Sequence, residues 1–245
     1  DREEAERFLG VAVFLSLVIS AILMIIIYFN MDRIIYFIGG SDETFSYAKN
    51  YLFYINLGVP AAILGLVLNS VIRSDGSPKI AMGTLLIGAI TNIVLDPIFI
   101  FMFGMGVKGA AIATIISQYV SMIWTIHYFM SKRSKIKLIK KDIRYDFYKS
   151  KEICLLGSSA FAIQIGFSLV TYILNTVLKK YGGDTSIGAM AIVQSFMTFM
   201  AMPIFGINQG IQPILGYNYG AKKYKRVKEA LYKGIFAATI ICLIG

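Results

Sequence analysis

The run IAMGTLLIGAITNIVLDPIFIFMF, residues 80–103, decides the class of fold. At a helical rise of about 1.5 Å per residue, a run of this length crosses the roughly 30 Å hydrocarbon core of a bilayer. Backbone groups in lipid must be hydrogen-bonded within the chain, and the run lacks the alternating polarity of a barrel strand. It therefore predicts a transmembrane helix.

Similar apolar runs recur along the chain, and the 245 residues are 57% hydrophobic and 16% charged, with a mean hydropathy of +0.68. Soluble domains carry about 25% charged residues. The fold class that follows is all-α, a polytopic transmembrane helical bundle. We expect spans at residues 8–30, 46–72, 80–103, 109–130, 152–178 and 187–216, with an incomplete one from residue 230.

Both ends of the sequence look cut. It starts DREEAERFLG, without Met or a signal-peptide pattern, and its last apolar run is shorter than the roughly 20 residues that a span needs. We therefore expect a fragment of a longer chain.

The net charge of +10 has an uneven distribution. When the expected spans are threaded, all but five of the 24 Lys and Arg residues fall on one side; the five are Arg33, Lys49, Lys108, Lys179 and Lys180. The positive-inside rule makes the basic side cytoplasmic, including loops 131–151 and 217–229, in a plasma or inner membrane. The basic clusters indicate topology and contact with membrane lipid, and nucleic acid is not an expected partner.

The longest polar stretch, residues 131–151, predicts a boundary between two bundles. We assign an N-terminal lobe to 1–131, a cytoplasmic linker to 132–150 and a C-terminal lobe to 151–245. A weak repeat aligns Arg2 with Arg226 and Gly10 with Gly234. Six spans separate the two copies, so the repeats are parallel, and the whole protein is expected to hold twelve helices in two such lobes.

Asp96 is the one acidic residue deep inside an expected span. A charge there costs at least about 2.5–3.5 kcal/mol, so an intramembrane carboxylate indicates function. Asn92 lies one turn earlier on the same face. The alternative is that Asp96 stabilises a kink, because Pro97 frees a backbone carbonyl.

The following span carries a small and polar stripe that includes Ala110, Thr114, Ser117 and Gln118. Between the two spans, GMGVKG (104–109) matches a dinucleotide-binding pattern, but it lacks the βαβ context and predicts a tight turn. In such a hairpin Thr114 and Asp96 lie at similar depth. These residues, with Asn92 and a carbonyl near Ala110, predict a site for Na⁺ or H⁺, and the choice stays open. No other cofactor is expected.

Two further polar stripes suggest the wall of a substrate cavity, with the candidate residues Gln164, Asn175, Gln194, Met197 and Gln212. Polyspecific cavities use Met and polar groups in this way. Interhelical hydrogen bonds and gap filling by Met are the alternative explanation.

These features resemble the multidrug and toxic compound extrusion (MATE) transporters, bacterial drug-efflux branch, over essentially the whole chain. The matching blocks are IRSDGSPKIAMGTLLIGAITNIVLDPIFIFMFGMGVKGAAIATIISQ (72–118) and GINQGIQPILGYNYGAKKYKRVKEAL (206–231). The resemblance implies twelve helices in two lobes around a central cleft. It also implies an N-lobe cation site at Asn92, Asp96, Ala110 and Thr114. That site uses a further Asp on the family's first helix, which this chain lacks. The span 152–178 has no acidic residue beyond Glu152, so a second cation site is not expected.

The function we expect is a secondary antiporter that exports drugs in exchange for Na⁺ or H⁺ by alternating access. Its substrates would be small organic compounds, mainly cationic, and it would act as a monomer. A lipid-linked oligosaccharide flippase of related fold is the alternative, but its anionic substrates call for Lys or Arg inside the spans. An intramembrane enzyme would need a metal cluster or several close carboxylates, so we expect no enzyme. A scaffold protein is the third alternative.

Overall fold

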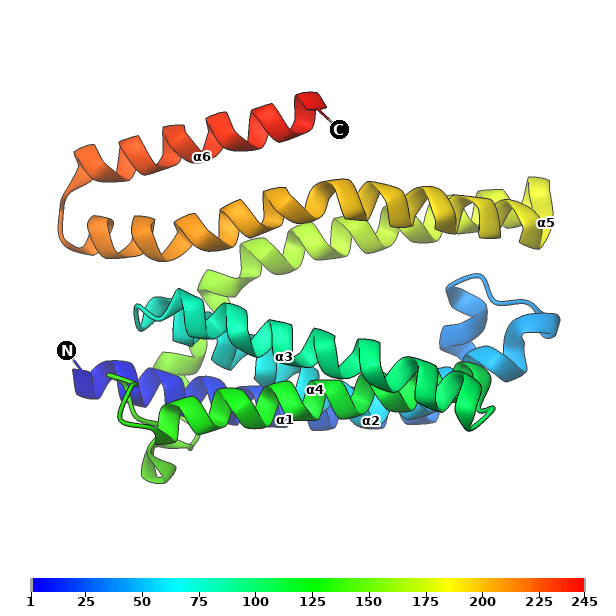
Figure 1. Ribbon diagram of the computed structural model, residues 1–245, viewed down its shortest axis with the longest axis horizontal. Coiled ribbons are helices and arrows are strands. Elements are labelled where there is room, and N and C mark those ends of the chain that lie inside the picture. Colours follow the sequence, from blue (N-terminus) through cyan, green and yellow to red (C-terminus); the bar gives the residue numbers. More distant parts are fainter. Residues whose placement is uncertain (1, 245) are drawn as a thin grey trace. The chain divides into compact units, whose positions relative to one another are not determined.

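The computed structural model describes residues 2–244, apart from the side chains of Asp184 and Ile244. All regular structure in this range is helical (Figure 1). The elements are α1 (Arg2–Phe37), α2 (Asp42–Ser74), α3 (Pro78–Pro97), the π-helix η1 (Ile98–Met102), α4 (Gly106–Met130), the 3₁₀-helix η2 (Lys140–Asp142), α5 (Phe147–Gly220) and α6 (Tyr224–Ile244).

Six helices in this range are long and apolar enough to cross a membrane, because α5 breaks at Gly183 into Phe147–Gly183 and Thr185–Gly220. The all-α prediction and the six predicted spans are confirmed. The helices extend beyond the predicted apolar bounds. Helix α1, for example, already begins at Arg2, because helical geometry continues from the apolar run into the flanking polar residues.

The chain divides into two compact units, Asp1–Thr176 and Val177–Gly245. The division into lobes at 131 and 151 is not tested and stays a prediction. In the second unit a glycine break, Gly183 with φ of 62° and ψ of −161°, precedes the rest of α5. Helix α6 then packs against this part of α5, with Gly234 close to the side chain of Ile211.

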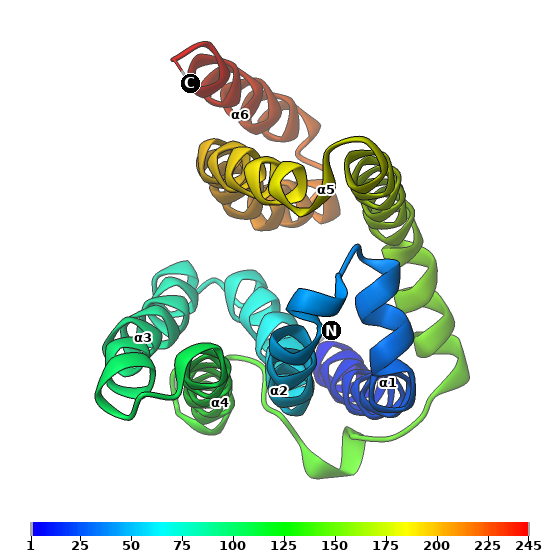
Figure 2. The ribbon, with the colours of Figure 1, turned by 90° about the vertical axis from the view of Figure 1, so that its right-hand side faces the viewer.

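The first unit is built around α2, which packs between α1 and α4, while α3 packs against α4 (Figure 2). Helices α1 and α3 begin, and α2 and α4 end, at the same end of this bundle, at the left of Figure 1. We call it the basic end. Its core is a cluster of buried apolar side chains: Leu9, Val13, Leu64, Leu68, Ile72, Ala81, Tyr128 and Phe129.

The segment 131–146, which we call the strap, is docked on the basic end. Three of its apolar side chains, Ile136, Leu138 and Ile143, pack against the core cluster. At η2 the strap backbone lies so close to α1 that a Cβ atom at Gly10 would clash with the Asp142 carbonyl. The polar composition of this stretch conceals these contacts, because its apolar residues are few and irregularly spaced.

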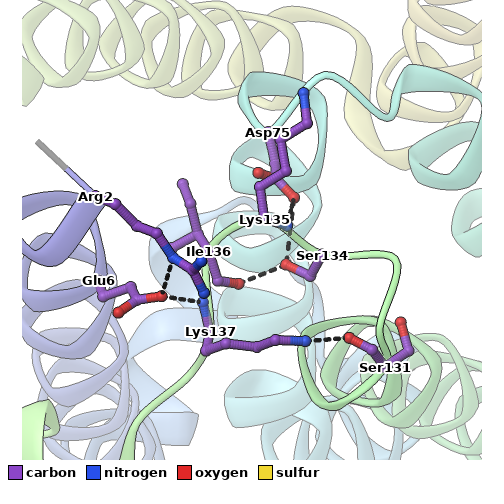
Figure 3. A network of polar contacts seen from close by, with 8 residues as sticks. All are labelled: Arg2, Glu6, Asp75, Ser131, Ser134, Lys135, Ile136 and Lys137. Atoms are coloured by element: carbon purple, nitrogen blue, oxygen red, sulfur yellow. Dashed lines mark hydrogen bonds and ion pairs between the residues drawn. The ribbon is translucent and has the colours of Figure 1, made fainter.

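Asp75, in the turn between α2 and α3, anchors the first part of the strap (Figure 3). This buried carboxylate accepts hydrogen bonds from the Lys135 backbone N–H (3.0 Å) and the Ser134 hydroxyl (3.2 Å). It also accepts one from the Tyr128 hydroxyl of α4 at 2.6 Å. A buried carboxylate is tolerated when donors surround it, so Asp75 ties the turn, α4 and the strap together.

Glu6 of α1 anchors the next part of the strap (Figure 3). Its carboxylate is buried and accepts hydrogen bonds from the Lys137 backbone N–H (2.9 Å) and from Arg2 Nε (3.0 Å). The Lys137 N–H lowers the pKa of Glu6, which precedes the apolar part of the helix. The carboxylate is therefore charged at neutral pH, and this contribution to docking is lost only as acid protonates it.

A comparison of two glutamates tests the docking. Glu6→Ala leaves the Lys137 N–H without its acceptor, at a cost of about 1–3 kcal/mol. We expect trypsin to cleave the strap about tenfold faster or more, because cleavage follows the population of the released segment. The matched control is Glu4→Ala, since Glu4 is exposed and has only a 3.9 Å contact with Lys149. Equal cleavage rates in the two variants would show that Glu6 is not an anchor.

Candidate functional site

Helix α3 carries two polar side chains, Asn92 and Asp96, within its apolar run. Asn92 Nδ2 donates to Asp96 Oδ1 at 3.2 Å, as the spacing of four residues allows. Both residues are half-buried. The predicted placement on one face is confirmed, and the carboxylate keeps capacity for further donors or a cation because it can accept several contacts.

Pro97 follows directly, and beyond it the α-helix passes into the π-helix η1. Proline has no N–H to donate to the preceding turn, and π-turns accommodate such an interruption. A kink and a binding site are compatible here, since the π-helix begins two residues after Asp96.

Helix α4 supplies two oxygen atoms. The Thr114 hydroxyl donates to the Ala110 carbonyl at 2.9 Å, so these oxygens are adjacent. Because the hydroxyl uses its proton in this bond, its lone pairs are available to a cation. The predicted ligand atoms on α4 are therefore held together by the helix itself.

The hairpin between α3 and α4 sets the relative depth of these groups. Gly104 and Gly106 have φ of 63° and 54°, values that favour glycine, and they form the predicted turn. A Cβ atom on Gly109 would lie 2.6 Å from the Phe99 carbonyl oxygen. The start of α4 thus lies directly against η1. This contact fixes the depth of Ala110 and Thr114 relative to the residues of α3.

A cavity of about 380 Å³ lies between α2, α3 and α4. Asn92 and Thr114 both line it, whereas Asp96 is not part of its lining. Asn92 therefore connects the two halves of the predicted set, as it contacts Asp96 and shares the cavity with Thr114. Helix α2 adds a wall that we did not predict, made of Ala61, Ala62, Gly65 and Leu66. The small residues among these were the available signal, since small side chains recur at close helix contacts.

Gln118 is the least satisfied polar group of the cavity lining. Its Oε1 atom is buried and has no hydrogen-bond partner among the described residues, and it points toward Gly58 of α2. By contrast, the Ser117 hydroxyl donates to the Thr114 carbonyl (2.7 Å), and the Ser121 hydroxyl donates to the Thr84 carbonyl (2.9 Å). An unpaired buried acceptor is suited to a donor group or a cation.

A buried polar network lies one turn beyond the cavity toward the basic end. Asn69 Nδ2 donates to the Thr84 hydroxyl (2.5 Å) and to the Ala81 carbonyl (2.8 Å). Asn69 Oδ1 in turn accepts a hydrogen bond from Arg73. Sequence reasoning missed this network, because Asn69 and Arg73 lie on α2 whereas Thr84 lies on α3.

The candidate substrate residues are divided between the two units. In the first, Gln164 is exposed and Asn175 Nδ2 donates to the Ile38 carbonyl at 3.2 Å. In the second, Gln194 and Met197 are exposed, and Gln212 lines a cavity of about 850 Å³ between α5 and α6. Their role in substrate binding stays a prediction.

Six membrane-length helices define the chain as a multi-pass membrane protein. The family model described as MatE matches residues 1–98 and 160–245. The chain belongs to this family, the MATE transporters.

Similar proteins agree with this assignment. The multidrug export protein MepA of Staphylococcus aureus (strain MSSA476) is 32% identical over 87% of this chain and 48% of its own length. A solved MATE structure in the bent conformation has a TM-score of 0.84 and 26% identity, over 100% of this chain and 55% of that one. A MOP superfamily transporter from Pyrococcus furiosus has a TM-score of 0.89 and 26% identity, over 100% and 54%.

The chain thus spans about half the length of the curated relatives that it matches. The names of these relatives describe exporters and transporters, which confirms the prediction of a transporter family rather than an enzyme family.

Gly109→Ala tests whether the hairpin contact holds the candidate site. The added methyl group meets rigid backbone, and overpacking of this kind costs about 1–3 kcal/mol. We expect a lower midpoint of thermal unfolding in detergent. Gly83→Ala is the control, because a Cβ at Gly83 has no atom within 4 Å and alanine favours the helix. A Gly109→Ala protein as stable as the control would contradict this account of the hairpin.

Proposed function

We propose that the whole protein is a secondary antiporter that exports small organic compounds in exchange for Na⁺ or H⁺. The observation that carries the proposal is the Asn92–Asp96 pair, which places a carboxylate within an apolar helix, in contact with an amide that lines the same cavity as Thr114. Family membership and the multidrug export of MepA, as its name states it, support the same reading.

Asp96 is the central group of the proposed coupling. A carboxylate withdrawn from water gains strongly from binding a proton or a metal cation. The Asn92 side chain, the Thr114 hydroxyl and the Ala110 carbonyl offer further hard oxygen atoms, which suit Na⁺. The same carboxylate serves H⁺ without these ligands, so both ions remain within the proposal.

Coupling requires that the ion and the compound prefer different conformations. An ion that binds more tightly in one access state shifts the population toward it, and the compound shifts it back. The ion and the compound are therefore exchanged across the membrane, because each stabilises only one of the two access states.

The substrate class follows from charge. The expected spans contain no Lys or Arg away from their ends, so neutral or cationic compounds are favoured over anionic ones. We further infer that the basic end and the 217–229 loop face the cytoplasm of a plasma or inner membrane, on the basis of the Lys and Arg distribution.

Asp96→Asn tests the proposal in the full-length protein reconstituted in vesicles. The amide carries no negative charge and binds no proton, so gradient-driven efflux of a fluorescent organic cation should fall by about tenfold or more. Imposing Na⁺ and pH gradients separately identifies the coupling ion. Asp32→Asn is the control, because Asp32 is exposed and pairs with Lys49 at 2.7 Å. Efflux by Asp96→Asn at the control rate would refute the proposed role.

Thr114 is tested through the dependence of efflux on cation concentration. Thr114→Val keeps the shape and removes the oxygen, and a lost ligand of this strength weakens affinity by about five- to tenfold. Thr114→Ser retains the hydroxyl and should stay close to wild type. If valine leaves the cation dependence unchanged, Thr114 is not a ligand.

A further inference from the structure

The strap presents a set of cations that its own contacts leave unneutralised. Segment 131–146 holds seven Lys or Arg residues against two Asp residues, a net charge of +5. The carboxylates of Asp75 and Glu6 bind the backbone N–H groups of Lys135 and Lys137, not their ammonium groups. The strap is thus fixed by its backbone, and the Lys137 ammonium group donates to the Ser131 carbonyl within the strap.

Three of these cations, Lys140, Lys141 and Arg144, surround the contact with α1. All three are exposed, and none forms an ion pair within the part of the chain that the structure describes. The nearby Asp146 has no described ion pair with them, and its Oδ1 accepts the Lys149 backbone N–H at 3.1 Å. The Asp142 carboxylate likewise has no described ion pair.

The strap crosses α1 where the helix changes from polar to apolar. Asp142 lies against Gly10, and the Tyr145 ring lies 6.4 Å from the Phe14 ring. One turn further along α1 begins an exposed apolar face with Leu17 and Val18. In a multi-pass protein such a border lies at the level of the lipid headgroups.

The strap also exposes apolar side chains among the cations. Ile139 is 38% exposed and Tyr145 is 59% exposed, and they flank Lys140, Lys141 and Arg144 in sequence. Basic residues interleaved with aliphatic and aromatic ones are typical of surfaces that lie in a membrane interface.

We propose that the docked strap is a binding surface for anionic phospholipid headgroups, with Lys140, Lys141 and Arg144 as its contacts. Docking by Asp75 and Glu6 fixes the backbone in advance, so lipid binding does not have to order the segment. This inference concerns the membrane partner and does not depend on which compound or ion the protein transports.

The test uses the full-length protein in phosphatidylcholine bilayers with a local reporter. Ile139→Trp places a fluorophore on the strap, and the signal is its quenching by brominated phosphatidylglycerol or brominated phosphatidylcholine, relative to the parent protein. We expect the anionic lipid to quench at a mole fraction about tenfold lower or more, since each cation near an anionic surface contributes roughly fivefold.

In this background, K140Q/K141Q/R144Q should remove most of that preference without unfolding the protein, because all three side chains are exposed. The matched control is K223Q/K225Q/K228Q, which removes the same charge from exposed positions around the α5–α6 turn. If the control variant keeps the preference for the anionic lipid, the result supports a specific surface on the strap rather than a general effect of positive charge. An equal loss in both variants, no preference in the parent, or its abolition by millimolar inorganic phosphate would each overturn the proposal.

Discussion

The cost of withdrawing a carboxylate from water shapes the first unit of this protein. Three such groups lie buried or half-buried in the α1–α4 bundle: Glu6, Asp75 and Asp96. Glu6 and Asp75 each accept two or more hydrogen bonds, from backbone N–H groups, hydroxyls and Arg2. The hydrogen bond described for Asp96 comes from one neutral amide. Because desolvated charge must be compensated, the first two serve the fold, while the third retains the capacity on which the proposed function depends.

The hairpin of α3 and α4 brings the residues of the candidate site together. A helix by itself places only residues one turn apart together, as it does with Asn92 and Asp96, or Ala110 and Thr114. The close contact of Gly109 with the Phe99 carbonyl holds the two helices together, and one residue of each pair, Asn92 and Thr114, lines the same cavity. Helix α2 closes that cavity with small residues, so three consecutive helices define the space that the proposed cation or compound would enter.

The strap shows how composition misleads when the backbone is the binding partner. Its sequence is dominated by Lys and Arg, which indicate topology and lipid contact. Its docking uses backbone N–H groups of those same residues, and such groups carry no sequence signature. Ile136, Leu138 and Ile143 were visible as apolar residues, but their spacing matches neither a helix nor a strand. Because the strap docks through its backbone, the Lys140, Lys141 and Arg144 side chains stay exposed, as the proposed lipid surface requires.

The sequence by itself determined the membrane class, the six spans, the α3–α4 turn and the pairing of Asn92 with Asp96. These follow from hydrophobic length, glycine and helical periodicity, which act between residues close in the chain. Only the tertiary structure decided which helices meet: that α2 lines the cavity, that Asn69 binds Thr84, and that Asp75 and Glu6 hold the strap. Such contacts join residues up to 131 positions apart. They depend on how helix faces pack, and in lipid that is set by close contact and hydrogen bonding rather than by a hydrophobic pattern readable along the chain.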